Sequence, residues 1–309
     1  MAAVADTAEQ LAWERRQARG AAIAALAAAL FTFVGTVWRG LTLADLPRTS
    51  VADALARAAQ PGPAGEAESL RVTTFEYYQD HATSVMLSSI MVAVGYIAMG
   101  WALSYLAAAT RARRPQLPRI MLYLPIIGGV LQGISTIVSS LATRSAIGSF
   151  LDGSRTVDEG LDIGTDGLAV FAQVLGLPGA LALALSLVLI ALNAMRVGLL
   201  TRFMGVLGMI TGALQILPIG GPLPVVQAFW LIMLAVLFLD RWPNGQPPAW
   251  RTGNPEPWPS SADVRAERQK ALAARRGDPA PEPEPEPAPV PERGPSPASA
   301  AMKRKRKRR

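Results

Sequence analysis

The sequence contains no cysteine and a single histidine among its 309 residues. The absence of cysteine excludes disulfides, thiolate nucleophiles and cysteine-based metal sites. Zinc centres normally use several His or Cys ligands, so His81 by itself predicts no metal site. No Gly-x-Ser-x-Gly elbow, Walker A loop or His-Glu-x-x-His motif is present. We therefore expect a protein without a catalytic site, a cofactor or a bound metal.

Charged side chains are also missing from five long apolar runs. A bilayer core about 30 Å thick is crossed by about 20 helical residues, so these runs predict an all-α, polytopic transmembrane bundle. Ionisable groups inside a membrane usually mark proton relays and ion pathways, so their absence argues against a pump or an ion-coupled transporter. The runs are Gly20–Trp38, Ala82–Thr110, Ile120–Thr143, Gly167–Met195 and Phe203–Leu239.

The last run is too long for one crossing, because as a straight helix it would reach about 55 Å. Its Pro/Gly-rich centre at 217–224 breaks a helix, which predicts two helices at about 203–217 and 225–239. The bundle then has six membrane segments, of which the last two either cross fully or form a short re-entrant hairpin. Both alternatives return the chain to the side on which it started.

The arginines predict the orientation, because short loops rich in Lys and Arg stay in the cytoplasm. Arginine is dense before the first run, between the second and third, and after the fourth, and sparser in the loops at about 39–81 and 144–166. We therefore expect both termini in the cytoplasm. The predicted parts are a flank at 1–19, the bundle at 20–240 and a Pro-rich tail at 241–309. The dense group comprises Arg15, Arg16, Arg19, Arg111, Arg113, Arg114, Arg119, Arg196 and Arg202.

The predicted tail ends in a polybasic tag. Of the 30 Lys and Arg residues seven form this tag, and the remainder equal the 23 acidic residues, so the net charge of +7 resides in the tag. On an extended Pro-rich tether at 280–297 it should contact anionic lipid head groups beside the membrane. Nucleic acid is a less favoured partner, since no stacking aromatics accompany the tag, and no protein partner can be named. The tag residues are Lys303, Arg304, Lys305, Arg306, Lys307, Arg308 and Arg309.

The polar side chains within the runs are uncharged. Gln132, Ser135 and Ser139 share one helix face, and Gln173 lies in the next run. They either line a cavity or form hydrogen bonds between helices, and we favour the second.

Two Gly-x-x-x-Gly motifs, at 129–133 and 208–212, predict close helix packing within the subunit. Pro178 predicts a kink or break, which transporters use at binding sites but which is also ordinary in membrane helices; we favour the ordinary kink.

The stretch at 193–205, Asn-Ala-Met-Arg-Val-Gly-Leu-Leu-Thr-Arg-Phe-Met-Gly, resembles a segment of uncharacterised multi-pass membrane proteins from high-GC Gram-positive bacteria. The Arg-Trp-Pro-Asn-Gly at 241–245, the Pro-Ala-Trp at 248–250 and the Pro-Trp-Pro-Ser at 257–260 resemble it as well. The resemblance is strongest over 193–260. It implies a multi-pass protein of the bacterial plasma membrane and no activity. The leading hypothesis is a non-enzymatic membrane protein with a cytoplasmic interaction tail; the alternative is a channel or carrier for a small neutral or apolar solute.

Overall fold

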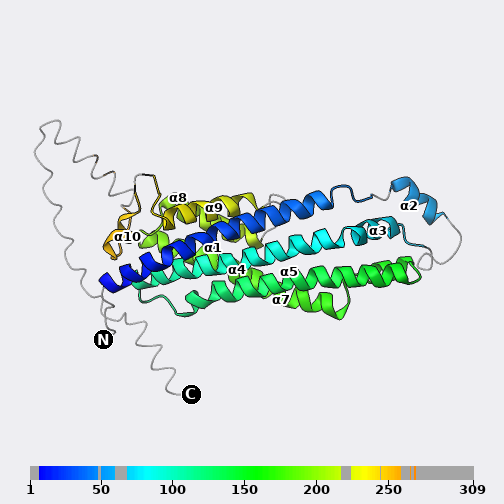
Figure 1. Ribbon diagram of the computed structural model, residues 1–309, viewed down its shortest axis with the longest axis horizontal. Helices are drawn as coiled ribbons and strands as arrows, with labels where there is room; N and C mark the ends of the chain where they lie inside the picture. The colour runs from blue at the N-terminus through cyan, green and yellow to red at the C-terminus, as the bar shows by residue number, and fades with distance from the viewer. Residues whose placement is uncertain are drawn as a thin grey trace, which may run out of the picture. The chain divides into compact units, whose positions relative to one another are not determined.

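The computed structural model describes residues 7–47, 50–59, 68–216, 224–243, 245–258, 265 and 268 (Figure 1). Its compact unit extends to Trp258, beyond the predicted end of the bundle at 240. Among the described residues the regular elements are all helices. They are α1 (Thr7–Thr42), α2 (Val51–Ala58), α3 (Val72–Asp80), α4 (Ala82–Arg113), α5 (Ile120–Asp152), α6 (Val157–Leu161), α7 (Gly167–Arg196), α8 (Arg202–Ile216), α9 (Val225–Phe238) and α10 (Pro248–Thr252).

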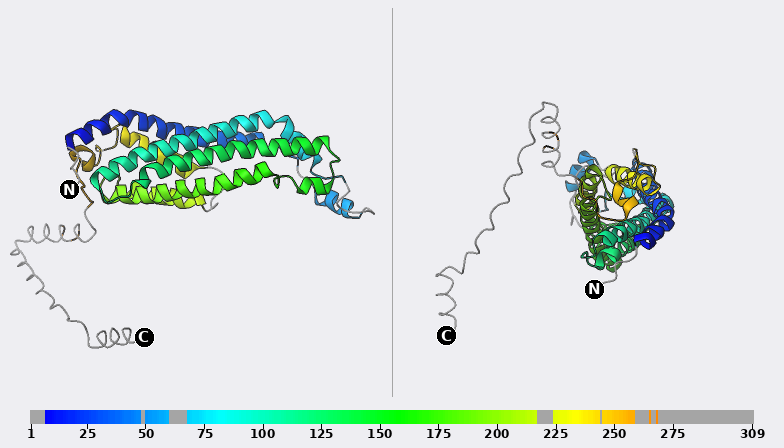
Figure 2. Two further views of the ribbon diagram at one scale, coloured as in Figure 1. Left: turned by 90° about the horizontal axis from the view of Figure 1, so that it is seen from below. Right: turned by 90° about the vertical axis from the view of Figure 1, so that its left-hand side faces the viewer.

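Four long helices, α1, α4, α5 and α7, are long and apolar enough to cross a membrane. They pack side by side in chain order, and α8 and α9 close the bundle against α7 and α1 (Figures 1 and 2). Large apolar side chains point outward from the bundle, among them Trp101, Phe171 and Leu185, each at least half exposed. An extensive exposed apolar surface marks a region that is covered by something other than water. These features support a membrane-embedded protein.

The two helices predicted in the last run are confirmed, at Arg202–Ile216 and Val225–Phe238. At 1.5 Å per residue they extend only about 22 Å and 21 Å, less than the hydrocarbon core. Both lie in the half of the bundle that contains the start of α1 (Figure 1). Six full crossings are therefore not evident, and four long helices plus two short ones describe the bundle. The predicted break at Pro178 is absent, because α7 continues through this residue.

Glycine allows the helices to approach one another closely. A Cβ atom at Gly129 would lie 2.5 Å from the carbonyl oxygen of Tyr96, and one at Gly212 would lie 2.8 Å from that of Ala184. The first contact joins α5 to α4, and the second joins α8 to α7. Both Gly-x-x-x-Gly motifs therefore serve packing within the chain, as the sequence predicts.

The dense group of arginines gathers at one end of the bundle, here called the basic end. α1 and α5 begin there, α4 and α7 end there, and α8 starts there (Figure 1). At the opposite end α3 and α6 pack on the extended ends of α4 and α5, with Phe75 and Phe150 in edge contact at 5.0 Å. Arg155 pairs there with Glu76 at 3.2 Å. The charge asymmetry on which the topology depends is thus retained in three dimensions.

Candidate functional site

The predicted polar face does not converge on one place. The Ser135 hydroxyl donates a hydrogen bond to the carbonyl oxygen of Ala172 on α7 at 2.8 Å, so it joins two helices. Ser139 and Gln173 are exposed on the outside of the bundle. α7 crosses α5 in antiparallel register, and Ser139 lies one turn beyond Ser135, toward the first turn of α7, where fewer neighbours cover it. The residues of this face therefore have different environments despite their helical spacing.

Gln132 is half-buried, whereas Ser135 is buried and Ser139 is exposed. The backbone of Gln132 abuts Gly179 of α7, and its buried Oε1 has no hydrogen-bond partner among the described residues. On the neighbouring α4, the backbone carbonyl of Tyr96 abuts Gly129, one turn before Gln132. The buried Nε2 of Gln227, in the first turn of α9, also has no partner within the described part of the chain.

A buried ion pair lies at the basic end. The Arg113 guanidinium donates from Nη1 and Nη2 to the two carboxylate oxygens of Glu14, at 2.5 Å and 3.0 Å. Their side chains are 0% and 4% exposed. Arg113 also donates from Nε and Nη2 to the carbonyl oxygen of Ala249, at 3.0 Å and 2.7 Å. One guanidinium therefore joins α4 to the first turns of α1 and to α10.

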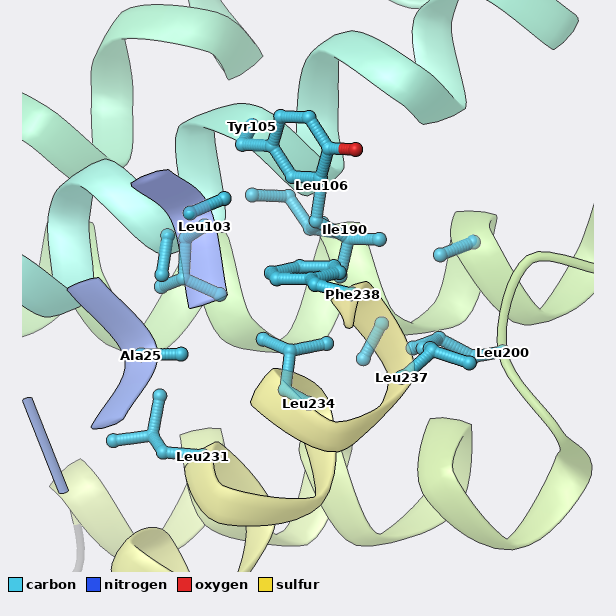
Figure 3. Close-up of a cluster of buried hydrophobic side chains, with 14 of the residues drawn as sticks. Ala25, Leu103, Tyr105, Leu106, Ile190, Leu200, Leu231, Leu234, Leu237 and Phe238 are labelled. Atoms are coloured by element: carbon cyan, nitrogen blue, oxygen red, sulfur yellow. The ribbon is translucent and has the colours of Figure 1, made fainter. Parts of the chain in front are cut away.

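Aromatic rings enclose this ion pair and exclude water from it. Tyr105 stacks on Trp13 at 5.7 Å and on Trp250 at 6.1 Å, and contacts the edge of Phe238 at 4.8 Å. Its hydroxyl donates to the carbonyl oxygen of Glu14 at 3.0 Å. Figure 3 shows Tyr105 and Phe238 above the leucines of α9. A charged pair in such surroundings contributes geometric definition and is costly to disrupt.

The segment after α9 is tied to the turn between α7 and α8. The indole Nε1 of Trp250 donates to the carbonyl oxygen of Leu199, and that of Trp258 to Leu200, each at 2.8 Å. The backbone N–H of Glu256 donates to the carbonyl oxygen of Val197 at 3.0 Å. The two stretches that carry the family resemblance, around 193–205 and 241–260, therefore contact each other directly. We call residues 246–258 the C-terminal strap.

Two surface cavities flank the ion pair at the basic end. One, of about 720 Å³, lies between α1, α4 and the strap, and the other, of about 460 Å³, lies between α1, α9 and the strap.

The ion pair between Arg113 and Glu14 was not predicted from the sequence, because the arginine count used Arg113 only to predict the orientation. Glu14 is 99 positions away from Arg113, so no local pattern links them. The one available signal was the acidic Glu14, set directly before Arg15 and Arg16.

The tag residues Lys303–Arg309 lie outside the described residues. No family model, no curated protein and no solved structure matches the chain.

Proposed function

We propose that this protein is a non-enzymatic, multi-pass protein of the bacterial plasma membrane that holds an interaction tail in the cytoplasm. The observation that carries the proposal is the strap, which Arg113, Trp250 and Trp258 fasten to the basic end. The chain that follows Trp258 thus leaves from a fixed point of the bundle. Arginine-rich ends face the cytoplasm, and a polybasic tag on a Pro-rich tether is suited to anionic head groups there.

The sidedness can be tested with single cysteines, because the natural chain has none. A membrane-impermeant maleimide added to intact cells should label a cysteine at Ser154, which is exposed at the end opposite the basic end. It should label one at Thr252 or Ala301 only after the cells are permeabilised. Labelling of Thr252→Cys from outside intact cells would reverse the proposed orientation.

The Ala301→Cys variant, carrying a fluorophore, also tests the tail. In nanodiscs of the full-length protein, energy transfer to a labelled lipid should be higher with an anionic bilayer than with a neutral one. Replacing Lys303–Arg309 by Gln should abolish the difference. Equal energy transfer in both bilayers would reject lipid as the partner of the tag. A loss of energy transfer in the anionic bilayer when RNA is added would favour nucleic acid as the partner.

A channel or carrier for a small neutral or apolar solute is the second candidate, and the observation that favours it is that Gln132 Oε1 and Gln227 Nε2 are buried without a hydrogen-bond partner among the described residues. If these groups only pack, Gln132→Leu should change the free energy of unfolding by at most about 1–2 kcal/mol and leave solute flux unaltered. Flux of glycerol and urea into reconstituted vesicles is the measurement, with Gln173→Leu, on the exposed surface, as the matched control. Loss of a protein-dependent flux in Gln132→Leu alone would place the carrier function first.

A further inference from the structure

The larger cavity at the basic end has walls of two kinds. Its volume of about 720 Å³ is within the range of small-molecule sites. Trp13, Ala108 and Leu122 form an apolar side, contributed by α1, α4 and α5. Arg16 and Arg111 line the same cavity. A ligand that fills it therefore needs an apolar part and a charged part.

The charges in the cavity favour an anion. Arg113 is neutralised by Glu14, so it contributes no free charge. The side chain of Arg16 is exposed and has no hydrogen bond or ion pair with the described residues. Arg111 donates its Nε to the carbonyl oxygen of Leu117 at 3.1 Å, while its terminal nitrogens have no partner in the described ranges. Against these two cations stands one carboxylate, Glu9, which leaves a single net positive charge.

The position of the cavity relates it to a bilayer. Trp13 and Arg16 precede the apolar part of α1 by one or two turns, and Arg111 follows the apolar part of α4. This level corresponds to the head groups of one leaflet, where tryptophan is enriched. Guanidinium groups bind phosphate through paired N–H donors, and basic pockets between membrane helices bind lipid head groups.

We propose that this cavity binds the phosphodiester head group of one phospholipid, with Arg16 and Arg111 on the phosphate and an acyl chain along Trp13 and Leu122. A phosphodiester carries one negative charge, which matches the net charge of the cavity, whereas Glu9 opposes a more highly charged head group. The site lies on the bundle and is separate from the polybasic tag. It requires this end of the bundle to reach a leaflet and is independent of which leaflet that is.

The test titrates the full-length protein, purified in a neutral maltoside detergent, with phosphatidylglycerol and counts bound lipid by native mass spectrometry. We expect one tightly retained lipid. Arg16→Gln should weaken its binding about fivefold, the effect of one cation near a lipid surface. The matched control is Arg19→Gln, an exposed arginine on the same helix that lines the other cavity, and it should change binding less than twofold. Glu9→Gln should strengthen binding about twofold.

Two further probes test whether the cavity binds a whole phospholipid or only one of its parts. Diacylglycerol has the apolar part alone, and glycerol 3-phosphate has the phosphate alone. Both should compete with phosphatidylglycerol at least tenfold less well. Equal losses in Arg16→Gln and Arg19→Gln would overturn the site, because binding would then reflect general charge. Competition by glycerol 3-phosphate as strong as by the lipid would overturn the lipid assignment.

Discussion

Replacing Arg113 by Met should lower the free energy of unfolding by about 3–5 kcal/mol, the usual cost of leaving one member of a buried ion pair without its partner. The variant leaves the Glu14 carboxylate without its ion-pair partner among aromatic rings, where its side chain is only 4% exposed. It also removes both hydrogen bonds to the carbonyl oxygen of Ala249. The measurement is reversible unfolding in mixed micelles by a denaturing detergent, followed by circular dichroism.

A double variant separates the pair from its surroundings. Glu14→Leu combined with Arg113→Met leaves no buried charge, so it should be more stable than Arg113→Met alone. Arg19→Met, at an exposed position on α1, should change stability by less than about 0.5 kcal/mol. Glu14→Leu alone completes the cycle. If its effect and that of Arg113→Met add in the double variant, the ion pair contributes no coupling and its proposed role in joining α1 to α4 is wrong.

Much of the bundle follows from composition along the chain. Apolar length predicts α1, α4, α5 and α7, and the Pro/Gly-rich composition of 217–224 predicts two helices in the last run, which are found as α8 and α9. These features depend on local properties, namely the transfer of apolar side chains into lipid and the loss of helical hydrogen bonds at proline. Such local properties depend only on residues that are close in the chain, so they can be predicted from the sequence.

Contacts between distant segments are a different matter. The spacing of Gln132, Ser135 and Ser139 places them on one face, but the burial of that face changes along α5 because α7 covers only part of it. Similarly, the sequence predicts a Pro-rich tail that begins at 241, outside the bundle, whereas Trp250 and Trp258 dock on the backbone carbonyls of Leu199 and Leu200. These outcomes depend on which helix lies beside which, and the pattern of one segment does not specify its neighbour.

The strap depends on one backbone conformation, at Gly198. This residue has a φ of +79°, in the left-handed region that favours glycine. A Cβ atom there would overlap the carbonyl oxygen of Glu256. Gly198→Ala should therefore cost about 3 kcal/mol or more, from backbone strain and overpacking together, and should detach residues 254–258 from the turn. Limited trypsin digestion in detergent detects this release. Arg251 is exposed, but Trp250, Glu256 and Trp258 hold the strap on either side of the bond after it, so cleavage there needs a loosened strap.

Gly245→Ala is the matched control. Gly245 also has a positive φ, +85°, but a Cβ atom there would meet nothing within 4 Å. It should cost only the strain of the left-handed conformation, about 1 kcal/mol, and leave Arg251 protected. Arg265 and Arg268 are exposed, so trypsin should cleave there in every variant and provide an internal standard. Equal cleavage after Arg251 in both alanine variants would mean that backbone strain at a left-handed position is enough to release the strap. The close contact between Gly198 and Glu256 would then not be what holds it. Protection in both would mean that the 197–200 turn does not anchor it, and the fixed departure point of the tail would be lost from the proposed function.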